Sequence, residues 1–168
     1  MASTTIQNAP SSSSSPSSKP QPKYEVFLSF RGEDTRNTFR DHLCHALDKK
    51  GIITFKDDED LAMGDSISAE LFDAIEKSGM AVIIVSKNYA SSSWCLEEIA
   101  KIVECMKSGL KVLPIFYHVE PSDVRHQMGI FEVAFAKHEK RFNENTVQKW
   151  RAALTEVANL PRIHIKDG

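Results

Sequence analysis

Residues 80–85 (MAVIIV) are the longest apolar run of the chain and the feature that most constrains its fold. A continuous run of this length is typical of a central parallel strand that is buried on both faces. Six residues are too few to cross a bilayer. The run therefore predicts a sheet that helices cover on both sides.

Short apolar segments and helical periods alternate around this run. Further strands are predicted at residues 24–30, 52–55, 111–117 and, as a short extra strand, 163–165. Helices are predicted at residues 36–50, 66–78, 94–107 and 129–140, together with a short turn from Pro121 and a last helix capped by Asn145. Pro114 suggests that its strand lies near a sheet edge. The alternation predicts an α/β fold with a doubly wound parallel sheet of about five strands in the order 2-1-3-4-5.

Composition divides the chain and excludes several classes of protein. Residues 1–22 contain eight Ser and four Pro, so we expect a disordered tail there. The remainder carries 20 basic and 23 acidic residues, which argues against a nucleic-acid partner. Three cysteines without a C-x-x-C motif predict free thiols in a reducing compartment. No secretory signal and no membrane span are visible in the sequence.

The topology predicts where a ligand would bind. In a doubly wound sheet, ligands bind beyond the carboxyl ends of the strands where the winding direction reverses, here between the first and third strands. The loops at this point are residues 31–35 and 86–93. The first contains Arg31, Gly32 and Glu33, and the second leads into a helix that carries Trp94 and Glu98. These last two residues are four positions apart and share a helical face, which places an aromatic ring one turn from a carboxylate. The alternative is structural, because a Glu in a first turn favours the helix dipole and a Trp usually packs.

Other kinds of site are less well supported. A phosphorelay receiver would need an Asp at the end of the third strand, where this chain has Ser86 and Lys87. The acidic run 57–60 lacks the alternate spacing of a calcium loop. His42 and His45 share a helical face, but no third ligand completes a metal site, so no metal is expected. The glycine-rich nucleotide-binding motifs are absent.

Four blocks of sequence resemble the plant TIR domain, the N-terminal module of many intracellular plant immune receptors. They are YEVFLSFRGEDTR at 24–36, FKDDEDLAMGDSIS at 55–68, SKNYASSSWCLEEI at 86–99 and VLPIFYHVEPSDVRHQMG at 112–129. The resemblance covers residues 23–160 and implies a flavodoxin-like fold. It also implies an NAD+ nucleosidase that becomes active on self-association, signals defence and cell death, and resides in the cytoplasm or the nucleus. Residues 161–168 would then begin a linker to further domains.

The resemblance assigns roles to the residues of the predicted site. Glu98 would be catalytic, and Trp94 would line the cleft. Four residues of the first block would also contact the ligand: Phe30, Arg31, Gly32 and Glu33. The substrate would be NAD+ or NADP+, with no permanently bound cofactor, and the bond between nicotinamide and ribose would be cleaved.

Self-association is also implied, through the first helix and the region after the fourth strand. The matching positions are Arg36, Asp41, His42, Pro121, Arg125 and Gly129. The family often has a Ser-His pair where this chain has Asp41 and His42, so only the histidine carries over. The partners implied are a second TIR domain, bound weakly by the isolated domain, and downstream immune signalling proteins. Two alternatives remain open: a scaffold that signals only through TIR–TIR contacts, and a domain that binds NAD+ without consuming it.

Overall fold

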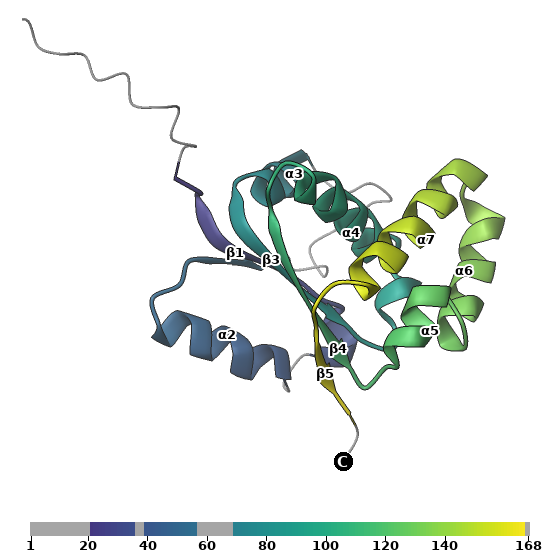
Figure 1. Cartoon of the computed structure of the whole chain (residues 1–168), viewed down its shortest axis with the longest axis horizontal. Helices are drawn as coiled ribbons and strands as arrows, with labels where there is room; N and C mark the ends of the chain where they lie inside the picture. Colours follow the sequence, from purple (N-terminus) through teal and green to yellow (C-terminus); the bar gives the residue numbers. More distant parts are fainter. Residues whose placement is uncertain (1–20, 36–38, 57–68, 167–168) are drawn as a thin grey trace, which may run out of the picture.

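Five parallel strands form one sheet in the part of the chain that the structure, a computed structural model, describes: residues 21–35, 39–56 and 69–166. The strand order is β2-β1-β3-β4-β5, as predicted. Figure 1 shows the twisted sheet with helices on both of its faces. The strands are β1 (Tyr24–Ser29), β2 (Thr54–Lys56), β3 (Ser78–Val85), β4 (Lys111–Tyr117) and β5 (Ile163–Ile165).

The apolar run forms the middle strand of the sheet, which confirms the first prediction. β3 pairs with β1 on one side, where Ser29 lies opposite Ile83, and with β4 on the other. The side chains of Ile83, Ile84 and Val85 are fully buried. Helices on both sides exclude water from this strand, which explains why it has no polar face.

Helices cover the two faces unequally (Figure 1). The helices are α1 (Gly32–Thr35), α2 (Phe39–Lys49), α3 (Ala69–Glu76), α4 (Ser93–Met106), α5 (Pro121–His126), α6 (Ile130–Arg141) and α7 (Glu144–Ala158), with a 3-10 turn η2 (Tyr89–Ser91). Cys44 of α2 joins Val26 and Leu28 in one core cluster. Phe27 faces the other way and belongs to the larger cluster that α3, α4 and α7 contribute to. Successive residues of β1 thus supply both cores, as the period of a strand requires.

Three local predictions were wrong. Residues 31–35 were expected to be a loop, but Gly32–Thr35 form the short helix α1. The second strand starts at Thr54 rather than at residue 52. The last helix is capped by Asn143, whose side-chain oxygen accepts a 2.8 Å hydrogen bond from the backbone N–H of Thr146. A cap needs an extended backbone, which Asn143 has, whereas Asn145 is already in the first helical turn.

Pro114 lies on the strand next to the edge of the sheet, as predicted. β4 pairs with β3 and with β5, and Pro114 is opposite Ile83 in the first of these ladders. The ladder with β5 covers only residues 115–117 of β4. Proline lacks a backbone N–H, so it is tolerated where one side of the strand needs no ladder hydrogen bond.

The three cysteines are free thiols, as predicted, and two of them are buried. Burial raises the pKa of the Cys44 thiol and of the Cys105 thiol. Both are therefore more fully protonated at neutral pH than an exposed cysteine, which suits a packing role. Of the described helices, none is long and apolar enough to cross a membrane.

Candidate functional site

The segments that follow β1 and β3 are joined by the carboxylate of Asp34, which lies in α1. One of its oxygens accepts a 2.5 Å hydrogen bond from the hydroxyl of Ser86 and a 2.7 Å bond from the backbone N–H of Asn88. The other oxygen accepts a 2.7 Å bond from the side-chain amide of Asn88. We call these three residues the Asp34 clamp. The clamp holds together the two loops that the topology predicted to meet.

A second set of contacts joins β1 to the start of α4. The Tyr89 hydroxyl is 2.7 Å from the Ser29 hydroxyl and donates a 3.2 Å hydrogen bond to the carbonyl of Cys95. The Cys95 thiol lies 3.6 Å from the carbonyl oxygen of Phe30, to which it donates. The backbone at the end of β1 is therefore in direct contact with the first turn of α4.

The first turns of α4 carry the two residues predicted to do chemistry. The helix begins after Ser92, whose hydroxyl accepts a 3.1 Å hydrogen bond from the backbone N–H of Cys95. Trp94 follows in the first turn and is half-buried against the larger core cluster. Glu98 lies one turn further and is only 1% exposed. Glutamates are rarely so deeply buried, which makes Glu98 the most unusual residue of the helix.

The residues predicted to line the cleft after β1 lie in different environments. The ring of Phe30 is buried in the core cluster on the α2 side, with the guanidinium carbon of Arg40 4.5 Å from its centroid. Arg31 is half-buried, and its carbonyl accepts a 3.0 Å hydrogen bond from the hydroxyl of Thr35. Gly32 is buried in α1. The side chain of Glu33 lies outside the described residues. Of these residues, Phe30 contacts α4 through its backbone carbonyl, whereas its ring packs on the α2 side of the sheet.

The residues predicted for self-association fall on two regions. At the start of α2, Asp41 accepts a 2.9 Å hydrogen bond from the guanidinium of Arg40, and His42 is exposed. Arg36 lies outside the described residues, as does the acidic loop 57–65.

The other three predicted residues shape the segment between β4 and α6. Pro121 is buried at the first position of α5, where a missing N–H has no cost. Arg125 donates a 3.2 Å hydrogen bond to the carbonyl of Ala158 at the end of α7. Gly129 precedes α6 with φ of 61° and ψ of −126°, a conformation that side chains disfavour. These residues set the direction in which α6 leaves α5.

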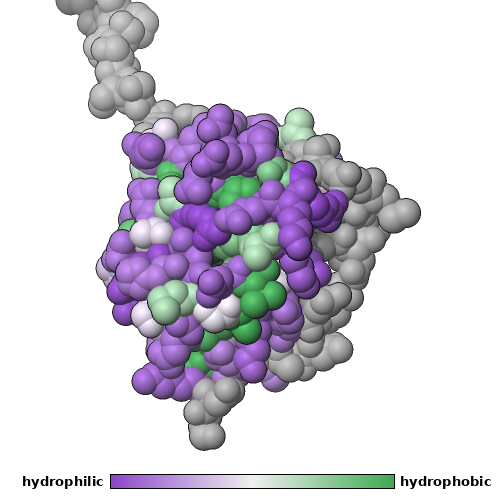
Figure 2. Space-filling model, turned by 90° about the vertical axis from the view of Figure 1, so that its right-hand side faces the viewer, coloured by the Kyte–Doolittle hydropathy of each residue, from purple (hydrophilic) through white to green (hydrophobic). Residues whose placement is uncertain are grey.

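Large apolar side chains are exposed at the start of α6. Met128, Ile130 and Val133 are between 48% and 58% exposed, and we call them the α6 patch. Figure 2 views the side on which α6 and α7 lie in Figure 1, and hydrophobic residues gather there among hydrophilic ones. Neighbouring exposed apolar residues often mark a surface that binds another protein.

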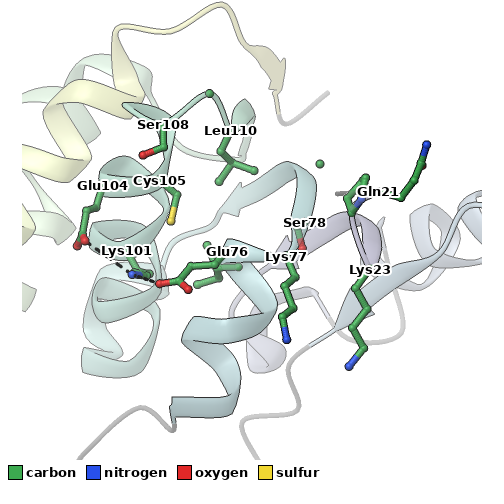
Figure 3. A pocket seen from close by; sticks show the side chains of 14 residues that line it. Gln21, Lys23, Glu76, Lys77, Ser78, Lys101, Glu104, Cys105, Ser108 and Leu110 are labelled. Atoms are coloured by element: carbon green, nitrogen blue, oxygen red, sulfur yellow. Dashed lines mark ion pairs between the residues drawn. The ribbon is translucent and has the colours of Figure 1, made fainter. Parts of the chain in front are cut away.

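A cavity of about 750 Å³ lies elsewhere. It is lined by the start of β3 and the last turns of α4, at the opposite end of the sheet from the Asp34 clamp, and Figure 3 shows it from close by. The ammonium group of Lys101 beside it is paired with Glu76 at 2.6 Å and with Glu104 at 3.7 Å. None of the predicted site residues that the structure describes lines this cavity.

A doubly wound parallel sheet, with polar segments and a buried carboxylate beyond β1 and β3, defines an α/β domain whose candidate site lies at the topological switch point. The family model of the TIR domain matches residues 23–168. The chain therefore belongs to the TIR domain family, and its relatives are plant disease resistance proteins.

Two curated relatives and one solved structure illustrate the similarity. The chain is 54% identical to disease resistance protein RPV1 of Vitis rotundifolia over 99% of its own length, and 51% identical to TMV resistance protein N of Nicotiana glutinosa over 87%. It spans only 12% and 13% of these relatives. The TIR domains of the activated Roq1 resistosome, which recognises the pathogen effector XopQ, superpose with a TM-score of 0.75 at 53% identity. That match covers 84% of this chain and 86% of the other.

Proposed function

We propose that this chain is the signalling domain of a plant disease resistance protein and that it cleaves NAD+ or NADP+ when it self-associates. The observation that carries the enzymatic part is Glu98, a carboxyl group buried beside the switch point and one helical turn after Trp94. A carboxylate held in a dry environment interacts more strongly with a developing positive charge than one in water.

The proposed reaction breaks the bond between the nicotinamide nitrogen and C1′ of the ribose. The bonding electrons leave with nicotinamide, which neutralises its positive charge, and the ribosyl group becomes a cation. Glu98 stabilises this cation by its charge, while Trp94 stacks on a ring of the substrate and Arg31 binds a phosphate. Water then adds to C1′ and releases a proton. Glycosidases also stabilise such cations with carboxylates, although they commonly use a pair of them.

Self-association is supported by the α6 patch. Its three side chains leave a substantial apolar area in contact with water, and covering it would be favourable. The similar TIR domains of Roq1 belong to an activated resistosome, which is consistent with an active state that requires several copies. We propose a second copy of this domain as the partner and downstream immune signalling proteins as later ones.

The test is release of nicotinamide from NAD+, and separately from NADP+, by the purified chain at concentrations where light scattering detects association. The wild type should release nicotinamide. Glu98→Ala should lower the rate at least a hundredfold, because the transition-state charge loses its counter-charge.

The matched control is Glu97→Ala, which removes the neighbouring, half-exposed carboxylate of the same helix. It should retain most of the wild-type rate. If the associated wild type releases no nicotinamide, the chain is better described as a scaffold that signals by association alone. If it binds NAD+ in that state without releasing nicotinamide, it is a sensor without turnover.

A further inference from the structure

His138 on α6 makes a buried contact with the turn that precedes the candidate site. Its side chain is 6% exposed, and its Nε2 atom lies 2.7 Å from the carbonyl oxygen of Ala90 in η2. A carbonyl oxygen can only accept a hydrogen bond, so the imidazole must carry its proton on Nε2. The proposed function assigns no role to this histidine.

Aromatic rings fix the direction in which the imidazole points. The rings of Phe135, Phe142 and Trp150 lie with their centroids 5.9, 5.8 and 5.4 Å from that of His138. Two of these contacts are edge-to-face, the arrangement that aromatic pairs prefer. The ring is therefore held firmly by α6 and α7, and any movement of α6 moves the Nε2 atom with it.

The carbonyl oxygen in this contact belongs to Ala90, which lies in the chain between the Asp34 clamp and the start of α4. Ala90 is 1% exposed, and two backbone hydrogen bonds flank it. The N–H of Tyr89 donates to the carbonyl of Ser86, and the N–H of Ser92 donates to the carbonyl of Tyr89, each at 3.2 Å. Ser86 belongs to the Asp34 clamp, and Ser92 caps α4. Ala90 therefore lies between the Asp34 clamp and the cap of the helix that carries Trp94 and Glu98.

The same helix carries the α6 patch. His138 follows Val133 by five residues, which places the two side chains about 140° apart around the helix axis. Val133 is 58% exposed, whereas His138 is buried. α6 thus exposes apolar side chains to solvent on one side and, on another, makes a buried hydrogen bond through His138.

We infer that His138 is a positioning residue that couples self-association through α6 to the arrangement of the site at the start of α4. Binding of a second copy at the α6 patch shifts α6, and the hydrogen bond to Ala90 transfers this shift to η2 and α4. This inference rests on the proposed function. It names the contact through which association increases the rate of nicotinamide release. The geometry of the candidate site then differs between the assembled state and the monomer.

The test compares His138→Phe with His138→Gln. Phenylalanine keeps an aromatic ring among Phe135, Phe142 and Trp150 but has no hydrogen-bond donor. The amide of glutamine can still donate a hydrogen bond to the Ala90 carbonyl. Each variant is measured for association by light scattering, for nicotinamide release in the associated state, and for hydrogen exchange of the backbone of residues 86–98 with and without association. Ala153→Gly, a buried change on α7 that leaves the contact with Ala90 in place, controls for a general loss of stability.

In the wild type, association should slow hydrogen exchange in residues 86–98. In His138→Phe the association constant should be unchanged, the exchange of residues 86–98 should no longer respond, and nicotinamide release should fall at least tenfold. His138→Gln should restore most of the exchange response and most of the nicotinamide release. Ala153→Gly should behave like the wild type.

The hydrogen exchange readout separates the two proposals. If association changes exchange in the wild type but not in His138→Phe, the coupling stands even where no nicotinamide is released, and only the enzymatic proposal fails. If residues 86–98 respond equally in the wild type and in His138→Phe, or respond in neither, the coupling is overturned. A chain that does not associate at any concentration overturns the coupling and the association part of the proposed function together.

Discussion

Asp34 receives three hydrogen bonds from residues that are more than fifty positions away in the sequence. Replacing it by asparagine keeps the shape but puts an amide donor opposite groups that are donors themselves. We expect Asp34→Asn to lower the free energy of unfolding by about 1–3 kcal/mol, because the buried hydroxyl of Ser86 and the exposed Asn88 both lose a charged acceptor. Urea unfolding followed by circular dichroism measures this change.

A second aspartate provides the control for this prediction. Asp73 forms a 2.8 Å ion pair with Lys77 in which both side chains are about half exposed. Water screens such a pair, so Asp73→Asn should change the free energy of unfolding much less than Asp34→Asn does. Equal effects of the two substitutions would show that the Asp34 clamp is no stronger than a surface contact.

At the scale of single elements, α6 offers the most direct test of the proposed interface. Val133→Lys places a charge in the α6 patch and should weaken self-association at least tenfold, since a contact there would have to bury the ammonium group. The substitution should leave stability nearly unchanged, because the side chain is exposed. Analytical ultracentrifugation over a range of concentrations measures the association constant.

Ile53→Lys is the matched control for this element. Ile53 precedes β2 and is 58% exposed, the same fraction as Val133, so both variants add one positive charge at an equally exposed aliphatic position. The control should associate like the wild type. If both variants lose association equally, added positive charge rather than the α6 patch is responsible.

The sequence predicted most elements because their periodicity is set by burial. Long amphipathic helices such as α4 and the apolar run of β3 were found within a few residues of their ends. The errors concern features that depend on neighbours. Gly32–Thr35 form α1 rather than the expected loop, and Asp34 of this helix is bonded to Ser86 and Asn88, which are distant in the sequence.

At the scale of the whole molecule, the sequence predicted that the helix carrying Trp94 and Glu98 would begin near the end of the first strand. The topology of the sheet is sufficient for this prediction, because it brings the carboxyl ends of the first and third strands together. The sequence did not predict the Asp34 clamp, although Asp34, Ser86 and Asn88 all lie in recognised motifs, since a partner fifty residues away has no local signal. His138 was missed for a similar reason, because it binds a backbone carbonyl, which any residue type can supply.

Cysteine labelling tests how far the folded molecule protects its interior. Cys105 is half-buried, while Cys44 and Cys95 are buried. We expect a maleimide to modify Cys105 first, but more slowly than a free cysteine, because burial raises the pKa of its thiol and less thiolate is present at neutral pH. The rate should rise as the pH approaches this raised pKa, and mass spectrometry of peptides would follow each site. Rapid labelling of Cys44 would contradict the described core.

The strand order has a consequence for synthesis of the chain. Of the described strands, β1 is synthesised first, yet its Ser29 lies opposite Ile83 of β3, more than fifty residues later. At 5–20 residues per second, roughly 3–11 s pass before that partner is made. During this interval only β2, which covers one edge, is available to pair with β1. The apolar residues of β1 are then a nascent segment open to chaperones, and the strand gains its second neighbour only when the middle strand of the sheet arrives.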